Sequence, residues 1–305
     1  MTSPQPLPSY YPLGPASVSG SLITLDVMLN EPTRITAYLA DLSLQNFIAD
    51  KIFTPGGDVS GGSIIYSQIT YNDLYPSRDV ATVAPGGEFP NLTATRPSPL
   101  VAVPEKFGGK YGVTREEKKR NDPWVVQSAG VKIMNAIVRK INARAMTALA
   151  FAVAQTGGAT SVIGNNWAAT VTGGASQTTN QQWPASDFAR ANMIGEQTEL
   201  GYQYDLWIVN PQEKAHFSEV YAGVGVAQGQ LDSNNVTMLS TNRVPPGTAY
   251  AVSPGRLGQM RMEDPLSTET WYEAGEQTTW FQSWCTPAFA VTEPYAVLKF
   301  TGLAG

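Results

Sequence analysis

Residues 57–155 place an extended apolar hairpin directly before a long basic helix, and this order constrains the fold more than any other feature of the chain. Ser63–Tyr71 is rich in β-branched and aromatic residues and predicts a strand; Leu100–Val103 begins the return strand, and Pro85-Gly86-Gly87 marks a turn between them. An arm of ~15–20 residues each way would reach roughly 50–65 Å. Because an isolated two-stranded ribbon is marginal in water, we expect the arm to lie on other chains. A hairpin folded over its own domain is the alternative.

The helix that follows has a predicted start and a predicted end. Asp122 is a favourable N-cap, Pro123 suits the first helical position, and Gly157-Gly158 ends the helix at the latest. Its apolar stripe and its basic positions are Val126, Ile133, Ile137, Ile141, Ala145 and Ala148, and Lys132, Arg139, Lys140 and Arg144. A helix of about 30 residues would be roughly 45 Å long. We therefore expect it to support the layers that pack on it.

The remaining segments predict a domain of mixed helices and strands. Helices are predicted at Thr33–Phe47, Ser186–Leu200 and Pro211–Val220, and strands at Asp205–Val209, Thr248–Val252, Gln259–Glu263, Thr270–Tyr272, Thr278–Phe281 and Ala296–Thr301. Residues 1–21 are proline-rich and show no periodicity, and residues 156–182 predict a polar surface loop, either without strands or with one strand pair. Gly223–Gln230 predicts a glycine-rich loop.

Charge is unevenly distributed along the chain. Ten of the 20 basic residues fall between Lys106 and Arg144, where only three residues are acidic. From Phe151 to Ala290, twelve residues are acidic and five are basic. This division indicates either two solvated surfaces or charge complementarity between subunits. The net charge of −5 argues against a general nucleic-acid-binding protein, which would carry a basic excess.

The sequence shows neither a disulfide framework nor a membrane segment. Cys285 is the only cysteine and lies among apolar residues, which predicts a buried, inert thiol. No basic residue precedes Arg34, so the N-terminus lacks the charged region of a signal peptide. The longest apolar run, Ala148–Ala154, is far shorter than the roughly 18 residues of a spanning helix. We expect a soluble protein of a reducing compartment.

No residue pattern predicts catalysis. His216, the only histidine, lies on the predicted helix Pro211–Val220, and the chain has no Gly-x-Ser-x-Gly elbow to provide a nucleophile. The Gly223–Gln230 segment lacks both the Gly-x-Gly-x-x-Gly spacing and the Lys-Ser/Thr ending of phosphate-binding loops. One histidine and one cysteine do not support a transition-metal site. We predict no catalytic, cofactor-binding or metal-binding residues.

The order of these segments resembles the major capsid proteins of tailed bacteriophages, of the Hong Kong 97 type. The stretches that carry the resemblance are Pro32–Leu42, Lys110–Glu117, Asp205–Pro211 and Glu293–Gly302. The resemblance implies an α+β fold with an N-terminal arm, an extended β-hairpin called the E-loop, a long spine helix in a peripheral domain, and a mixed α/β axial domain. The implied boundaries are 1–30 for the N-terminal arm, 57–105 for the E-loop, 31–56, 106–150 and 277–305 for the peripheral domain, and 151–276 for the axial domain.

The resemblance also implies a function. The chain would be a non-catalytic protein that self-assembles into the pentamers and hexamers of an icosahedral shell around double-stranded DNA, without sequence-specific DNA binding. It would be assembled in the bacterial host cytoplasm and reside in the virion capsid, with a portal, a possible decoration protein and, because only a short segment precedes the first predicted helix, a separate scaffolding protein. The alternatives are an encapsulin-like cellular compartment, which the proline-rich start disfavours, and, more remotely, a hydrolase.

The resemblance leads us to expect inter-subunit contacts from three groups of residues. They are the E-loop residues Ile64, Tyr66, Tyr71, Tyr75, Arg78, Phe89 and Arg96, the basic residues Lys118, Lys119 and Arg120, and the glycines Gly223, Gly225 and Gly229. In the family, peripheral domains meet at threefold axes, and axial domains at fivefold and sixfold axes. The family prototype cross-links through an E-loop lysine, whereas this chain has no lysine between Lys51 and Lys106. We therefore expect no such covalent link.

Overall fold

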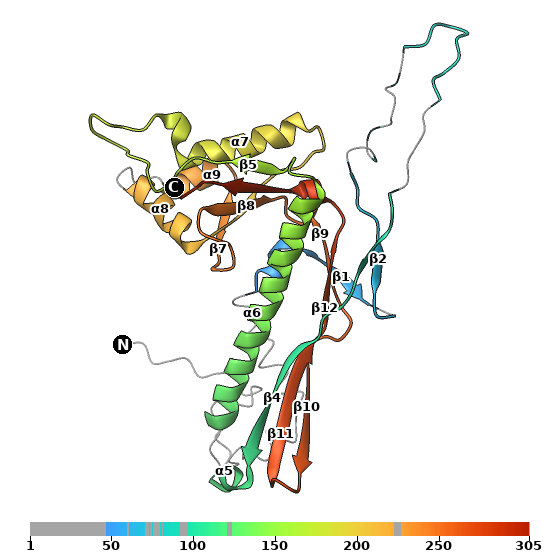
Figure 1. Cartoon of the computed structure of the whole chain (residues 1–305), viewed down its shortest axis with the longest axis vertical. Coiled ribbons are helices and arrows are strands. Elements are labelled where there is room, and N and C mark those ends of the chain that lie inside the picture. Colours follow the sequence, from blue (N-terminus) through green and yellow to red (C-terminus); the bar gives the residue numbers. More distant parts are fainter. Residues whose placement is uncertain are drawn as a thin grey trace, which may run out of the picture.

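The structure, a computed structural model, describes residues 47–59, 61–70, 73, 75, 80, 82–91, 97–120, 124–222 and 227–304. Within them the chain forms an upper layered part, a narrow lower part built along one helix, and an arm that projects away from both (Figure 1). The predicted N-terminal arm 1–30, residues 33–46 of the helix predicted at Thr33–Phe47, and the caps Asp122 and Pro123 lie outside the described residues.

Helix α6 (Trp124–Gln155) joins the two parts of the body and confirms the predicted long helix. Its buried residues recur at helical spacing, as in Ile133, Ile137 and Ile141, and an adjacent residue such as Val138 is buried as well, so the buried face of the helix is broad. The strands that it contacts lie in both the lower and the upper part. Gly157 and Gly158, with φ of 61° and 94°, then turn the chain away, in a backbone conformation that favours glycine.

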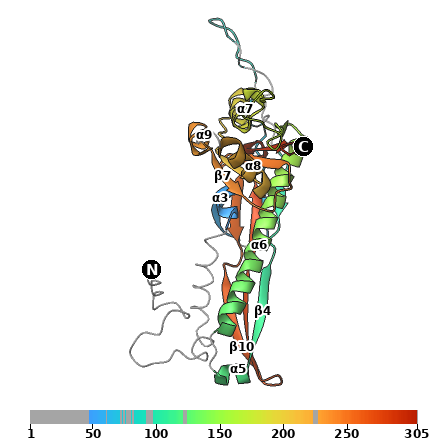
Figure 2. The same cartoon turned by 90° about the vertical axis from the view of Figure 1, so that its left-hand side faces the viewer.

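Two three-stranded sheets lie along α6 (Figure 2). One has the antiparallel order β10 (Ser267–Glu273), β11 (Thr278–Cys285), β4 (Phe107–Thr114). The other has the order β1 (Thr54–Asp58), β9 (Gly258–Met262), β12 (Pro287–Val291), with β1 parallel to β9. Two short helices flank them, α3 (Ala49–Ile52) before β1 and α5 (Arg115–Arg120) after β4.

The upper part is built on a five-stranded sheet. Its order is β5 (Ser161–Ile163), β13 (Val297–Thr301), β8 (Thr248–Val252), β6 (Leu206–Val209), β7 (Thr237–Ser240). Helices α7 (Pro184–Gln197), α8 (Pro211–Ala222) and α9 (Ala227–Ser233), with 3-10 turns at Asn180–Gln182 and Pro294–Ala296, complete it. Every residue of β6 and β8 is buried, as expected for central strands covered on both faces.

The arm contains one short ribbon, in which β2 (Ile64–Tyr66) pairs antiparallel with β3 (Leu100–Ala102). This confirms the predicted hairpin, but β2 is shorter than the predicted strand Ser63–Tyr71. The turn at Pro85-Gly86-Gly87 is confirmed by a hydrogen bond of 2.9 Å from the Gly87 N–H to the Ala84 carbonyl. After β2, the chain hydrogen-bonds its own body again, where the Ile69 N–H donates to the Thr292 carbonyl at 2.7 Å.

Strand pairing divides the chain differently from the boundaries predicted at 151–276 and 277–305. β9 and β10 come from the first segment but pair with β12 and β11 along α6, whereas β13 comes from the second segment and pairs with β8. The segments from β8 to β9 and from β12 to β13 therefore connect the upper and lower parts in addition to α6, and local sequence patterns cannot reveal such long-range pairings. The loop predicted at Gly223–Gln230 is wrong in its second half, because α9 begins at Ala227.

Candidate inter-subunit surfaces

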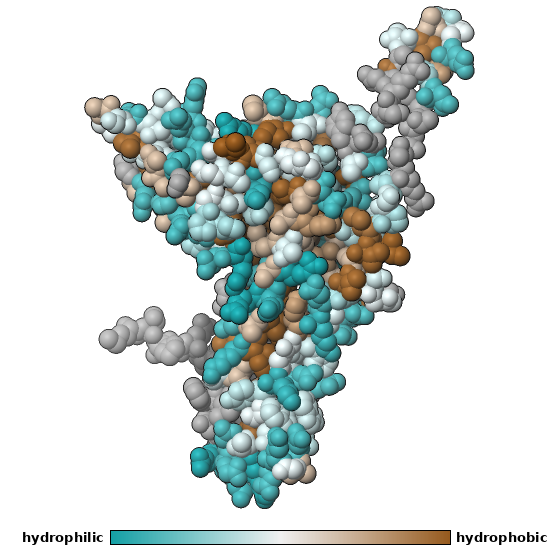
Figure 3. All heavy atoms as spheres, in the orientation of Figure 1, coloured by the Kyte–Doolittle hydropathy of each residue, from teal (hydrophilic) through white to brown (hydrophobic). Residues whose placement is uncertain are grey.

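The ribbon at the base of the arm has one face on its own body and one open face. Alternate residues of a strand point to opposite faces. Ile64 is 7% exposed and packs with Ala288 and Ala290, whereas its neighbour Ile65 is 72% exposed. Ile65 stands opposite Val101, which is 59% exposed, and the two make an apolar pair that nothing in the described chain covers. Figure 3 shows apolar side chains gathered where the arm leaves the body.

The tip of the arm is also uncovered. Phe89 follows the Pro85-Gly86-Gly87 turn and is 81% exposed, and Glu88 beside it is exposed as well. An exposed aromatic ring at the end of a projecting hairpin forgoes most of the free energy that its burial would supply, about 1.5–3 kcal/mol. Such a residue commonly marks a contact surface.

The outer face of the β10–β11–β4 sheet carries tryptophans capped by lysines. Lys110 Nζ lies 4.6 Å from the centroid of the Trp280 ring, and Lys106 Nζ lies 4.8 Å from that of Trp284. Glycines in β4 leave room for these rings, because a Cβ added to Gly112 would stand 3.0 Å from the Trp280 ring. The result is a flat aromatic surface with cationic ends.

Between the free edge of β4 and α6 lies a hollow of about 390 Å³, which we call the β4–α6 hollow. Its floor is apolar and includes Phe107, Ile133 and Ile137, and three lysines line its rim. They are Lys106, Lys132 and Lys140. The hollow therefore combines an apolar floor with positive charge, which suits an anionic group attached to an apolar one.

The lower end of the body carries a second basic hollow, of about 360 Å³. Thr114 and Glu117 form a reciprocal capping box at the start of α5: the Thr114 N–H donates to Glu117 Oε2 at 2.9 Å, and the Glu117 N–H donates to Thr114 Oγ1 at 3.4 Å. This cap orients α5 so that Arg115, Lys118 and Lys119 face the end of the β10–β11 hairpin, where Tyr272 is exposed. α5 and this hairpin end lie together in both views (Figures 1 and 2).

The predicted contact residues fall into four groups, of which buried Ile64 alone forms the last. Exposed on the surface are Phe89, Lys119, Arg120 and Gly229; half-buried are Tyr66, Tyr75 and Lys118; and Tyr71, Arg78, Arg96, Gly223 and Gly225 lie outside the described residues. Ile64 instead packs on its own body, and the Tyr75 hydroxyl donates to the Glu199 carbonyl of its own chain at 2.9 Å. Ile65 was not among the contact residues predicted from the sequence. Because alternate residues of a strand point to opposite faces, Ile65 lies on the face of the predicted strand opposite to Ile64.

The buried carboxylate of Asp187 in the upper part has structural partners. Asp187 Oδ2 accepts hydrogen bonds from Trp167 Nε1 at 2.8 Å and from the Asn165 N–H at 3.0 Å, which fixes the segment after β5. Burial raises the pKa of Asp187, although these hydrogen bonds oppose that effect.

His216 is half-buried on α8, and in the described part of the chain no hydrogen bond joins it to a serine, a cysteine or a carboxylate. Nor do the described residues group three or more side chains of the types that bind metal ions. Among the described helices, none has the length and apolar character to cross a membrane. The hydrolase alternative thus gains no support from geometry.

Comparison with known proteins gives consistent results. Residues 98–300 match the family model described as phage capsid protein. No curated protein matches the chain. The capsid structure of Cyanophage P-SCSP1u aligns with a TM-score of 0.60 and 12% identity, over 85% of this chain and 89% of that one. A structure from Mycobacterium phage Bobi aligns with a TM-score of 0.58 and 12% identity, over the same shares of the two chains.

A third similar structure is the virus-like particle from Pyrococcus furiosus, with a TM-score of 0.56 and 11% identity over 87% of this chain and 97% of that one. At such identities the three structures establish a shared fold and nothing finer. The family match spans residues 98–300 of 305. It covers α6, the β10–β11–β4 sheet, the β4–α6 hollow and nearly all of the five-stranded sheet.

Proposed function

The chain belongs to the phage capsid protein family and has the Hong Kong 97-type capsid fold, and from this premise we propose that its copies form the pentamers and hexamers of an icosahedral shell around the double-stranded DNA of a tailed phage. It is a capsid protein of the virion. The proposal includes a purely structural, non-catalytic role, assembly in the host cytoplasm, and a portal, a separate scaffolding protein and a possible decoration protein as partners.

The observation that carries the proposal is the open face of the arm. Ile65 and Val101 form an apolar pair on a ribbon that projects from the body, and Phe89 lies exposed at its far end. Covering each of these side chains would contribute about 1.5–3 kcal/mol. In a closed shell every copy both provides an arm and receives one, so this contribution recurs at every subunit.

We assign the parts of the body by analogy with the family. The lower part, built from α6 and the two three-stranded sheets, would be the peripheral domain; the five-stranded part, including β13, would be the axial domain; and the arm would be the E-loop. Lys118, Lys119 and Arg120 on α5 would then lie near a threefold axis, and Gly229 near the centre of a capsomer. The mixture of Lys and Arg on α5 with Glu273 and Glu276 on the adjacent hairpin supports contacts between unlike charges of neighbouring copies.

The second candidate is the shell of a cellular compartment, which the similarity to the virus-like particle from Pyrococcus furiosus favours. The contents of the particle distinguish the two. Particles would be isolated from producing cells, treated with nuclease and opened. Protected double-stranded DNA of uniform length supports the phage shell, whereas protein cargo without DNA supports the compartment.

The test of assembly itself is direct. The purified chain would be examined by sedimentation and negative-stain electron microscopy over a range of concentration and salt. We expect capsomers or polyhedral shells, and a 32.8 kDa monomer under every condition would contradict the proposal. Boiling the particles in detergent should return monomers, because the arm lacks the lysine that the prototype uses; a ladder of covalent oligomers would contradict that part.

A further inference from the structure

We propose that Glu88 and Phe89 at the tip of the arm dock into the β4–α6 hollow of a second copy, with the Phe89 ring on the apolar floor and the Glu88 carboxylate among the lysines of the rim. This inference rests on the proposed shell function and adds to it a specific pair of surfaces. It concerns Lys132 and Lys140 on the rim and the two tip residues, none of which has a polar or aromatic partner among the described residues.

The tip of the arm presents an acidic side chain beside an aromatic one. The turn at Ala84–Gly87, closed by the 2.9 Å hydrogen bond and by Gly86 at φ 83°, leads directly into Glu88 and Phe89. Both side chains are exposed, and among the described residues neither has a polar or aromatic partner. In Figure 1 the tip lies at the end of the molecule far from the lower half of α6, so its own hollow is out of reach. The occupant must therefore come from another copy.

The hollow has the matching chemistry. On α6, Lys132, Ala136 and Lys140 are four residues apart and line one face, so the small Ala136 leaves an opening between two ammonium groups. Phe107 and Ile133 form an apolar floor below them. A volume of about 390 Å³ falls in the range of roughly 300–1,000 Å³ found for small-molecule pockets, and it therefore admits an aromatic side chain.

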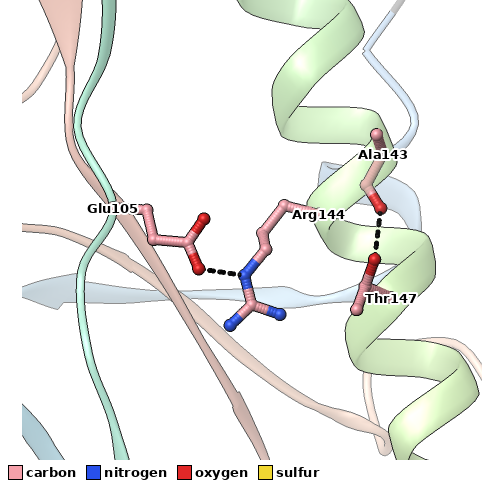
Figure 4. Close-up of polar contacts among 4 residues, drawn as sticks. All are labelled: Glu105, Ala143, Arg144 and Thr147. Carbon is pink, nitrogen blue, oxygen red and sulfur yellow. Dashed lines mark hydrogen bonds and ion pairs between the residues drawn. The ribbon is translucent and has the colours of Figure 1, made fainter.

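The next basic residue on the same face of α6, Arg144, has an ion-pair partner within the chain. Arg144 Nε donates to Glu105 Oε1 at 2.7 Å, and Figure 4 shows Glu105 reaching it from the segment that enters β4. Within the described part of the chain, no carboxylate makes a corresponding ion pair with Lys132 or Lys140. These two lysines are thus available to a carboxylate from a neighbour, and Glu88 is adjacent to the aromatic residue that the floor accommodates.

DNA is the other anion that lysines bind, but the hollow does not suit it. Phosphate contacts need cations on an accessible polar surface and provide no apolar group for a floor of Phe107, Ile133 and Ile137. The chain's net charge of −5 also disfavours general affinity for DNA. The charge complementarity and the apolar floor together favour a protein segment.

The first test is disulfide trapping in assembled particles. Cys285 is the chain's single cysteine and is buried, so introduced cysteines can be read without interference. One population of subunits would carry Glu88→Cys and a second would carry Lys140→Cys, and the two would be co-assembled and oxidised. We expect disulfide-linked dimers that contain one subunit of each kind. The matched control replaces Lys140→Cys by Lys214→Cys, an exposed lysine on α8, and should give none.

The second test exchanges the charges. Glu88→Lys alone and Lys132→Glu with Lys140→Glu should each lower the yield of assembled particles about tenfold, the effect of one lost charged contact, and the combination should recover much of the yield. Phe89→Ala should lower the yield without any partner that rescues it.

Three results would overturn the inference. They are shells that form normally without Phe89 and Glu88, trapping that is as strong at Lys214 as at Lys140, and Lys132→Glu/Lys140→Glu shells that assemble fully but retain less DNA. Each of these leaves the shell function intact, because shells still form. Failure of the unmodified chain to assemble would instead refute the proposed function.

Discussion

The five-stranded part and the arm use the same kinds of side chain in opposite ways. In the five-stranded part, Trp207 is fully buried, with its ring centroid 4.6 Å from that of Phe188 and 4.8 Å from that of Phe300. In the arm, Ile65 and Phe89 are exposed to solvent over most of their surfaces. The large apolar side chains of the five-stranded part are buried within the chain, whereas those of the arm remain exposed.

The difference indicates that folding and assembly depend on separate sets of residues. Aromatic clusters and fully buried strands stabilise the monomer, whereas the open face of the ribbon contributes free energy only when a second copy covers it. A variant should therefore be able to lose one property and keep the other. The predictions below are ordered by expected effect and test that separation.

Removal of the outer arm should have the largest effect. Replacing residues 76–96 by a short Gly-Ser linker keeps the β2–β3 ribbon and the hydrogen bond of Ile69 to Thr292. We expect assembly to be abolished in sedimentation, while the monomer unfolds within a few degrees of the unmodified chain, because the described tip residues, such as Glu88 and Phe89, are exposed to solvent. Shells of normal yield would show that the arm is dispensable.

Truncation in the upper part should have the opposite result. Trp207→Ala removes a large side chain from the centre of the aromatic cluster and should lower the free energy of unfolding by about 3–5 kcal/mol. Urea denaturation of the monomer measures this loss. As the matched control, Trp271→Ala on the exposed side of β10 should cost far less, and equal costs at the two positions would contradict the contrast in burial.

Polar substitution of the ribbon's open face should separate the two properties. Ile65→Ser with Val101→Ser should lower the yield of particles about tenfold, which corresponds to ~1.4 kcal/mol of lost contact. The stability of the monomer should change by no more than about 0.5 kcal/mol, because both side chains are already in water. Ile64→Ser, on the covered face, provides the comparison and should destabilise the monomer. The reverse pattern would contradict the assignment of the two faces.

The smallest predicted effect concerns the reactivity of the Cys285 thiol, whose burial can be tested without a substitution. Burial raises the pKa of the Cys285 thiol from 9.0 to about 11, so at pH 8 the reactive thiolate is about a hundredfold scarcer than in an unfolded chain. Labelling by a thiol reagent should be slow in the folded protein, accelerate as pH rises toward 11, and become rapid on unfolding. Rapid labelling at pH 8 in the native state would show that Cys285, the last residue of β11, is not buried.

Local periodicity was sufficient to predict several elements. The apolar spacing of α6 and the short apolar runs of β6 and β8 lie within continuous segments, and the structure confirms all three. β4 was not predicted as a strand, because glycines have low strand propensity. The structure explains them: a Cβ at Gly108 would stand 2.7 Å from the Cβ of Trp284 on the adjacent strand. A requirement of this kind arises between strands distant in sequence and leaves no local signal.

The candidate contacts were predicted only in part for the same reason. The arm and its exposed Phe89 follow from composition and turn residues, but Ile64 and Ile65 are chemically alike, and the packing of β12 alone decides which one faces the body. The sequence alone shows that basic residues are concentrated in the middle of the chain. Their arrangement around the β4–α6 hollow depends on β4 lying beside α6, a tertiary contact that no short pattern encodes.

A reconstruction of the assembled particles by electron cryo-microscopy tests the central claim most directly. The account predicts closed shells in which the open face of each ribbon, at Ile65 and Val101, is covered by a neighbouring copy. Shells in which each arm folds back on its own body, or a ribbon face that stays open to solvent in every copy, would contradict it.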